Sequence, residues 1–190
     1  MSGPAFVQPR QLPRQSFCLI RHGETTANRD GIIAGRLDVA LSDLGRRQAE
    51  ALQAYDWPAD LALFSSPQSR AQATCRLGFP GQEFRTLSGL RERDWGRFEG
   101  RPLAELPARE GRPEGGEDWG EMIDRVARAI SQCCAQSKDR LPVLICHSGV
   151  IRATRLLAGQ SSSGLRAPNA QPITFVWSGQ THNEELTYVG

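Results

Sequence analysis

Short apolar segments alternate with longer stretches of helical periodicity along this chain of 190 residues. Residues 17–20, 61–64 and 143–146 are apolar and mostly bounded by polar residues, which is typical of strands covered on both faces of a sheet. Between about 118 and 135, apolar side chains repeat at steps of three and four residues, which predicts a helix packed on a core. The alternation predicts an α/β fold in which helices cover both faces of a sheet, with these three strands at its centre.

Weaker signals predict the remaining elements. Ser42 is suited to cap a helix, Pro67 to occupy the first turn of another, and Gly159 to end a third. The predicted helices run from Ser42 to about Ala54, from Pro67 to about Leu77 and from about Val150 to Leu157, and two further strands are expected near Ile173–Trp177 and Leu186–Val189.

The length of the chain and its 39% content of hydrophobic residues predict one domain with one sizeable core. Residues 1–15 contain three prolines and no continuous apolar segment, so we expect a flexible leader followed by a single domain over residues 16–190. Residues 97–117 hold four glycines and three prolines among charged residues. This composition predicts an irregular surface excursion within the domain.

Composition excludes several classes of partner. The 23 basic and 21 acidic residues nearly cancel, so the sequence predicts neither nucleic-acid nor membrane binding. No apolar run approaches the roughly 18 residues of a membrane span, and no secretory signal is present, so we expect a soluble, cytoplasmic protein. The five cysteines lack C-x-x-C spacing and are expected to be reduced core thiols, with no disulfide frame and no metal site.

Polar residues follow each of the three predicted central strands. Arg21-His22, Ser65-Ser66 and His147-Ser148 lie at strand ends, and Arg70 lies in the helix expected after the second of these strands. The carboxyl ends of strands in an α/β sheet form a ligand crevice, where helix N-termini favour anions. These residues therefore predict a site for one phosphate-sized anion, whereas His182 is interpreted as an ordinary structural residue.

Five segments in a fixed order carry a family resemblance. They are "RHGETTAN", "LSDLGRRQAEAL", "SSPQSRAQAT", "LRERDWGRFEG" and "ICHSGVIRA". Together they resemble the histidine phosphatase superfamily, in its phosphoglycerate mutase-like branch, over about residues 16 to 160. The resemblance implies a three-layer αβα sandwich with a mostly parallel central sheet, and catalysis without a metal or another cofactor.

The resemblance also implies a role for each matching residue. His22 corresponds to the nucleophile that becomes phosphorylated. Glu92 matches the residue taken as the general acid in this family. The phosphoryl group is expected to contact Arg21, Asn28, Arg70 and His147, with Ser148 beside it at a position where many relatives have glycine.

The chemistry is sensible for these residue types. Neutral imidazole is a good nucleophile, and guanidinium groups match phosphate oxygens with paired hydrogen bonds. A carboxylic acid must protonate the leaving alkoxide, and the residues by themselves leave both Glu24 and Glu92 open for that role. The sequence thus predicts a phosphomonoesterase that forms a phosphohistidine. A phosphoglycerate-type mutase and a non-catalytic phospho-ligand binding module are the alternatives.

The sequence leaves the substrate open between two kinds of small phosphate ester. Arginines at 97, 101, 109 and 112 suit further negative charge, whereas Trp95, Phe98 and Trp119 suit a flat heterocycle. The overall layout resembles the small phosphatases of the family. Among their substrates, α-ribazole-5′-phosphate is the sharpest candidate.

Overall fold

The computed structural model describes residues 10–164 and 166–186, which form a six-stranded sheet flanked by helices. The strand order is β3-β2-β4-β1-β5-β6, in which β3, β2, β4 and β1 run parallel, β5 pairs antiparallel with β1, and β6 pairs antiparallel with β5 at the edge. The strands are β1 (Phe17–Arg21), β2 (Leu61–Ser65), β3 (Phe84–Thr86), β4 (Leu141–Cys146), β5 (Pro172–Trp177) and β6 (His182–Leu186).

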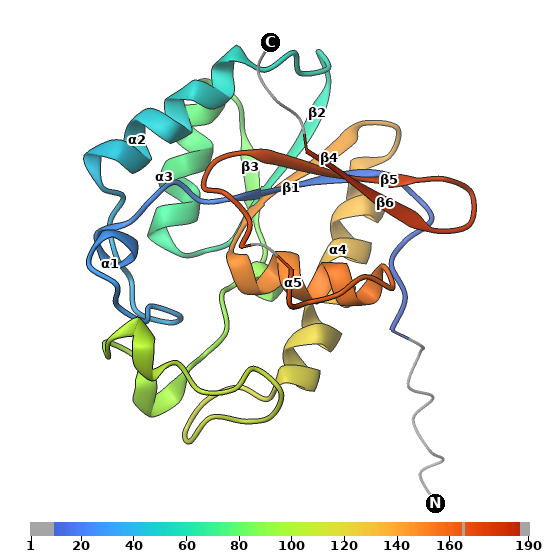
Figure 1. The fold of residues 1–190 in the computed structure, drawn as a ribbon. Coiled ribbons are helices and arrows are strands. Elements are labelled where there is room, and N and C mark those ends of the chain that lie inside the picture. The colour runs from blue at the N-terminus through green and yellow to red at the C-terminus, as the bar shows by residue number, and fades with distance from the viewer. Residues whose placement is uncertain (1–9, 165, 187–190) are drawn as a thin grey trace, which may run out of the picture.

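Helices cover both faces of this sheet (Figure 1). α2 (Asp43–Glu50), extended by the 3-10 turn η1 (Ala51–Ala54), packs with α3 (Ser69–Gly78) on one face. α4 (Trp119–Ser137) packs with α5 (Ser148–Leu157) on the other. The short helix α1 (Thr26–Arg29) follows β1, and the 3-10 turns η2 (Ser88–Leu90), η3 (Gly96–Phe98) and η4 (Leu103–Glu105) precede α4.

Alternation along β1 explains how one apolar strand serves two cores. Phe17 and Leu19 join the core beneath α4 and α5, whereas Cys18 and Ile20 join the core beneath α2 and α3. Side chains alternate across a strand, so a strand covered on both faces must be apolar throughout. The predicted αβα sandwich, its mostly parallel sheet and its three central strands are therefore confirmed.

Several predicted boundaries differ from the structure. α5 begins at Ser148, two residues before the expected start, and α3 begins at Ser69, so Pro67 precedes the helix instead of occupying its first turn. The last strand is His182–Leu186, where Leu186–Val189 was expected; residues 187–189 lie outside the described part of the chain. β3 was not predicted, because it is a three-residue edge strand with two exposed side chains.

The expected leader falls partly outside the described residues. Residues 1–9 are not described, and at residue 10 the guanidinium of Arg10 pairs with Asp124 of α4 at 2.6 Å. Within the described ranges, no helix has the length and apolar character needed to cross a membrane.

All five cysteines are buried free thiols. Burial raises the pKa of Cys18, Cys75 and Cys134 to about 12, and it also raises the pKa of Cys133 and Cys146. These side chains pack as small apolar groups in the two cores.

Candidate active site

The site lies where β1, β2 and β4 end side by side. The His22 N–H donates to the Cys146 carbonyl at 3.0 Å, and the Ser66 N–H donates to the Ile145 carbonyl at 2.9 Å. These bonds continue the parallel ladder past the strand ends and fix the residues that follow. As a result the rings of His22 and His147 lie 5.1 Å apart between centroids.

The hydrogen bond of His22 determines which ring nitrogen is reactive. Its Nδ1 lies 2.7 Å from the Gly23 carbonyl oxygen, which can only accept, so Nδ1 carries the proton and Nε2 keeps its lone pair. Burial lowers the pKa of His22 well below its usual range, and the charges of Arg70 and Arg21 lower it further. The ring is therefore a neutral imidazole whose Nε2 carries the free lone pair.

Gly23 is needed beside that histidine because the loop after β1 lies directly against the start of α2. A Cβ on Gly23 would lie 2.3 Å from the Gly45 carbonyl oxygen. The Gly23 N–H also donates to Thr74 Oγ1 of α3 at 3.0 Å. The loop is thus held from two helices, which fixes the carbonyl that orients His22.

His147 and Arg21 each carry a buried polar atom without a protein partner. His147 Nε2 lies 2.8 Å from Ser66 Oγ, but its Nδ1 has no hydrogen-bond partner, and neither does Nε of Arg21. Within the described residues these two are the buried side-chain polar atoms that lack a partner. Leaving such a group unpaired costs about 1–3 kcal/mol, so an anion that partners them would be favoured here.

Arg21 and Asn28 are joined into one polar wall. Arg21 donates to the Ala167 carbonyl at 2.9 Å and to Asn28 Oδ1 at 3.3 Å. The same Oδ1 accepts from the N–H of Thr25, which caps α1. Burial lowers the pKa of Arg21 to about 9, and the nearby charge of Arg166 contributes to this shift.

Arg70 is buried and donates to the backbone carbonyls of Ala34, Gly35 and Leu37. It does not line the cavity described below. Its charge nevertheless lowers the pKa of both histidines. The structure thus assigns Arg70 to holding the loop beside the site, and the expected direct phosphoryl contact remains a prediction.

The two candidate acids occupy different places. Glu24 Oε1 accepts from the Ser42 hydroxyl at 2.7 Å, at the start of α2, and Glu24 does not line the cavity. Glu92 lines it, and its carboxylate accepts from the Gly149 N–H at 3.0 Å. A Cβ on Gly149 would lie only 2.1 Å from Glu92 Oε1. The geometry favours Glu92 as the acid.

A cavity of about 230 Å³ opens in front of these residues. Of the predicted residues it is lined by Arg21, His22, Asn28, Glu92 and Ser148, whereas His147 and Arg70 do not line it. It is also lined by Arg152 and Arg166, which the sequence analysis missed. Arg152 lies four residues after Ser148 in α5, so the helical repeat could have revealed it. Arg166 follows no strand end and had no such signal.

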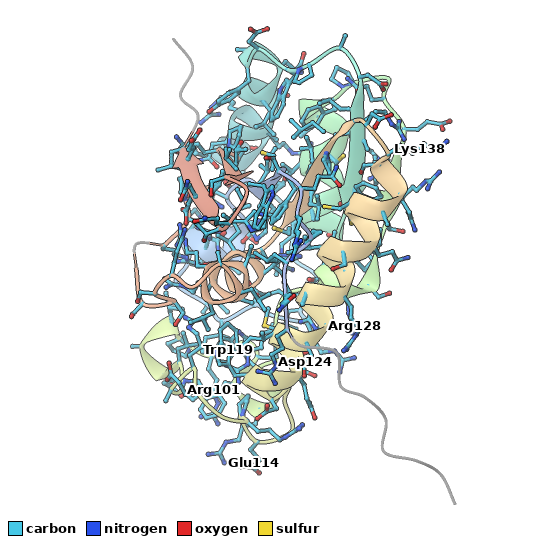
Figure 2. All side chains as sticks on the ribbon, turned by 90° about the vertical axis from the view of Figure 1, so that its right-hand side faces the viewer. Arg101, Glu114, Trp119, Asp124, Arg128 and Lys138 are labelled. Carbon is cyan, nitrogen blue, oxygen red and sulfur yellow. The ribbon has the colours of Figure 1, made fainter. Side chains whose placement is uncertain are left out.

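The four arginines in residues 97–117, before α4, have different surroundings. Ion pairs on the surface join Arg97 to Glu114, Arg101 to Glu105 and Arg112 to Glu121 at 2.6, 3.0 and 2.5 Å. Figure 2 shows Glu114 at the outer end of this segment, whereas Trp119 lies deeper, at the start of α4. Of Arg97, Arg101, Arg109 and Arg112, only Arg109 lines the cavity. The side chain of Trp95 lines it as well.

Two further side chains hold the surroundings of the site and were also missed. The Glu99 carboxylate accepts from the backbone N–H groups of Gly35, Arg36, Leu37 and Trp95. Gln68 donates to the Gly35 carbonyl at 2.6 Å and accepts from the Glu92 N–H at 2.8 Å. The loop that Arg70 holds is thereby tied to the backbone of the candidate acid.

Among the residues that the structure describes, no three His, Cys, Asp or Glu side chains gather as a metal site. The positive charge of the site comes from guanidinium groups.

Comparison with known proteins identifies the family of this chain. The family model of the histidine phosphatase superfamily (branch 1) matches residues 17–185. A metal-independent phosphoserine phosphatase of Arabidopsis thaliana is 30% identical over 80% of this chain and 72% of its own length. Mouse fructose-2,6-bisphosphatase TIGAR is 31% identical over 84% of this chain and 62% of its own.

Solved structures show the same fold. The protein TTHB049 of Thermus thermophilus has a TM-score of 0.74 at 29% identity, covering 92% of this chain and 99% of its own. An Escherichia coli protein provisionally named an α-ribazole-5′-P phosphatase has a TM-score of 0.77 at 23% identity, covering 90% and 95%. The chain belongs to the histidine phosphatase superfamily (branch 1), in its phosphoglycerate mutase-like group, and is a phosphatase of that family.

Proposed function

We propose that the protein is a metal-independent phosphomonoesterase that hydrolyses a small phosphorylated metabolite through a phosphohistidine at His22. The observation that carries this proposal is the orientation of the His22 ring, whose protonated Nδ1 bonds to the Gly23 carbonyl while Nε2 keeps its lone pair. Arg21 and Asn28 line the same cavity, and Glu92 supplies a carboxyl group there.

In the first step, His22 Nε2 attacks phosphorus and the bond to the ester oxygen breaks. Glu92, in its acid form, gives its proton to that departing oxygen. Arg21, Asn28 and His147 contact the phosphoryl oxygens, and the charge of Arg70 adds to the positive potential. Fixed positive groups of this kind normally supply the largest part of catalysis in phosphoryl transfer.

In the second step, water attacks the phosphorus of phosphohistidine. The Glu92 carboxylate takes a proton from that water, and the N–P bond breaks with its electron pair returning to Nε2 of His22. Inorganic phosphate leaves, and Glu92 is again an acid. Each residue returns to its starting form.

The short chain segment between acid and second histidine supports hydrolysis over mutase chemistry. Only 54 residues, 93 to 146, separate Glu92 from His147. A long lid that excludes water would favour return of the phosphoryl group to a sugar acid, and a short one favours water. α-Ribazole-5′-phosphate remains one candidate substrate, supported by the resemblance of the sequence to the small phosphatases of the family.

Rapid quench with 32P-labelled substrate tests the proposal. We expect an acid-labile, base-stable phosphoenzyme in the wild type, none in His22→Ala, and reduced turnover in His147→Ala. His182→Gln is the matched control, because the His182 ring packs at a tilt against Phe17 and Trp177 and does not line the cavity. A phosphoenzyme that persists in His22→Ala would overturn the assignment.

A further inference from the structure

Three arginines line the cavity in addition to Arg21, and within the described residues none of them forms an ion pair with a carboxylate. They are Arg109 before α4, Arg152 on α5 and Arg166 before β5. By contrast, Arg97, Arg101 and Arg112, which lie in the same segment as Arg109, all pair with glutamates. Of the four arginines in residues 97–117, the one without such a partner is therefore the one that lines the cavity.

The three side chains lie close enough to influence one another. Burial lowers the pKa of Arg152, and the positive charges of Arg109 and Arg166 lower it further. Arg166 also lowers the pKa of Arg21 and of His22. Arg166 thus lies within electrostatic range of both the phosphoryl pocket and Arg152, and the group extends outward from that pocket.

The protein fixes these cations where they repel each other. Arg152 donates to the carbonyls of Ser162 and Gly164, and so ties α5 to the segment that leads to Arg166. The guanidinium of Arg109 lies 6.0 Å from the ring centroid of Trp95 and 5.7 Å from that of Trp119. Holding like charges together without a carboxylate partner is unfavourable unless a ligand compensates them.

The aromatic side chains at this place are already occupied. The guanidinium of Arg93 lies 4.6 Å from the Trp95 centroid and 5.4 Å from that of Trp119. Arg93 itself is buried and donates to the carbonyls of Arg109, Gly111 and Glu117. Both indoles therefore serve as platforms for arginines, which argues against a wall that stacks a flat heterocycle.

We propose that Arg109, Arg152 and Arg166 form a second anion subsite, so that the enzyme selects small phosphomonoesters that carry a further carboxylate or phosphate group. The inference rests on the proposed function, since it places the scissile phosphate at His22. Leu103, Leu106 and Ile32 also line the cavity and suit the short carbon skeleton between the two anions. The volume of about 230 Å³ fits a metabolite of this size.

A matched pair of substrates tests the subsite. 3-Phosphoglycerate and glycerol 3-phosphate differ at one end, where a carboxylate replaces a hydroxymethyl group. We expect kcat/KM to favour 3-phosphoglycerate by roughly tenfold or more, as a charge-assisted hydrogen bond does. α-Ribazole-5′-phosphate, which has no second anion, is expected to be a poorer substrate than 3-phosphoglycerate.

Variants identify the arginines responsible. Arg109→Gln is expected to lower kcat/KM for 3-phosphoglycerate roughly tenfold while changing glycerol 3-phosphate less than about twofold. Arg166→Gln, whose charge also reaches His22 and Arg21, is expected to lower kcat/KM for both substrates, with the larger loss for 3-phosphoglycerate. Arg112→Gln is the matched control, because Arg112 lies in the same segment as Arg109 but pairs with Glu121 at the surface. Equal losses on both substrates, or equal losses in the control, would overturn the subsite.

The experiment separates failure of the subsite from failure of the proposed function. If the wild type hydrolyses p-nitrophenyl phosphate but does not distinguish the matched pair, the subsite is wrong and the phosphatase activity stands. If no ester is hydrolysed, calorimetric titration decides the subsite independently. Tighter binding of 3-phosphoglycerate than of glycerol 3-phosphate, lost in Arg109→Gln, would support it, and equal binding would refute it.

Discussion

Acid should destabilise this protein through the two buried histidines at the strand ends, His22 and His147. Burial lowers the pKa of both His22 and His147 well below the ordinary value, and Arg70 lowers both further. In the unfolded chain each ring regains a pKa of about 6.5. The two histidines therefore bind protons in the unfolded state at pH values where they stay neutral in the folded state. As a result, the free energy of unfolding decreases as pH falls below about 6.5.

The magnitude follows from proton linkage. Each ring that is protonated only in the unfolded chain lowers the free energy of unfolding by up to about 1.4 kcal/mol per pH unit. Two such rings give a slope that approaches about 2.7 kcal/mol per unit below pH 6. Because marginal stabilities are about 5–15 kcal/mol, one or two pH units remove a large share of the total.

Urea denaturation at pH 7.5, 6.5 and 5.5 measures this slope. The double variant His22→Asn/His147→Asn lacks both rings but keeps every other titrating group, so the difference between the two pH slopes isolates the histidines. We expect the wild type to lose about 2–3 kcal/mol more than the variant between pH 7.5 and 5.5. Parallel slopes for the two proteins would refute the reasoning.

Other perturbations test the surroundings of the site. Gly149→Ala places a methyl group where Glu92 Oε1 lies and so displaces that carboxyl group. We expect kcat to fall roughly 10²-fold or more while Tm changes by only about 2–4 °C. Unchanged turnover would remove Glu92 from the mechanism. Glu99→Gln turns an amide group toward the backbone N–H groups of the loop that Arg70 holds. We expect it to lower the free energy of unfolding by about 1–3 kcal/mol and to raise KM. An unchanged KM would contradict the role given to Glu99. Vanadate should inhibit and chelators should leave activity intact, because guanidinium groups supply the positive charge; activity lost in a chelator and restored by a divalent ion would argue otherwise.

The sequence predicted those parts of the fold that a local pattern determines. β1, β2 and β4 are continuous apolar runs because both of their faces are covered, so they were visible. β3 gave no such pattern, since two of its three residues are exposed at the edge of the sheet. Edge strands are held by pairing with a neighbour, and pairing leaves little trace in the sequence.

The same distinction holds for the site. The proximity of His22 and His147 could be predicted from the sequence, because both follow strands of a parallel sheet and such strands end at one edge. Arg166 lines the cavity from the irregular segment between α5 and β5. Such a segment has no helical or strand periodicity from which the position could be predicted. For Arg70 the sequence indicated a cation near the histidines, but only the folded loop shows that its donors bind carbonyls.

The burial of all five thiols has a consequence for oxidative conditions. Hydrogen peroxide and alkylating reagents attack the thiolate, and a cysteine that is buried with a raised pKa presents almost none. In the proposed mechanism the group that attacks phosphorus is an imidazole, so the reaction does not depend on a thiolate. We therefore expect this protein to retain its phosphatase activity at peroxide concentrations that inactivate phosphatases with a cysteine nucleophile.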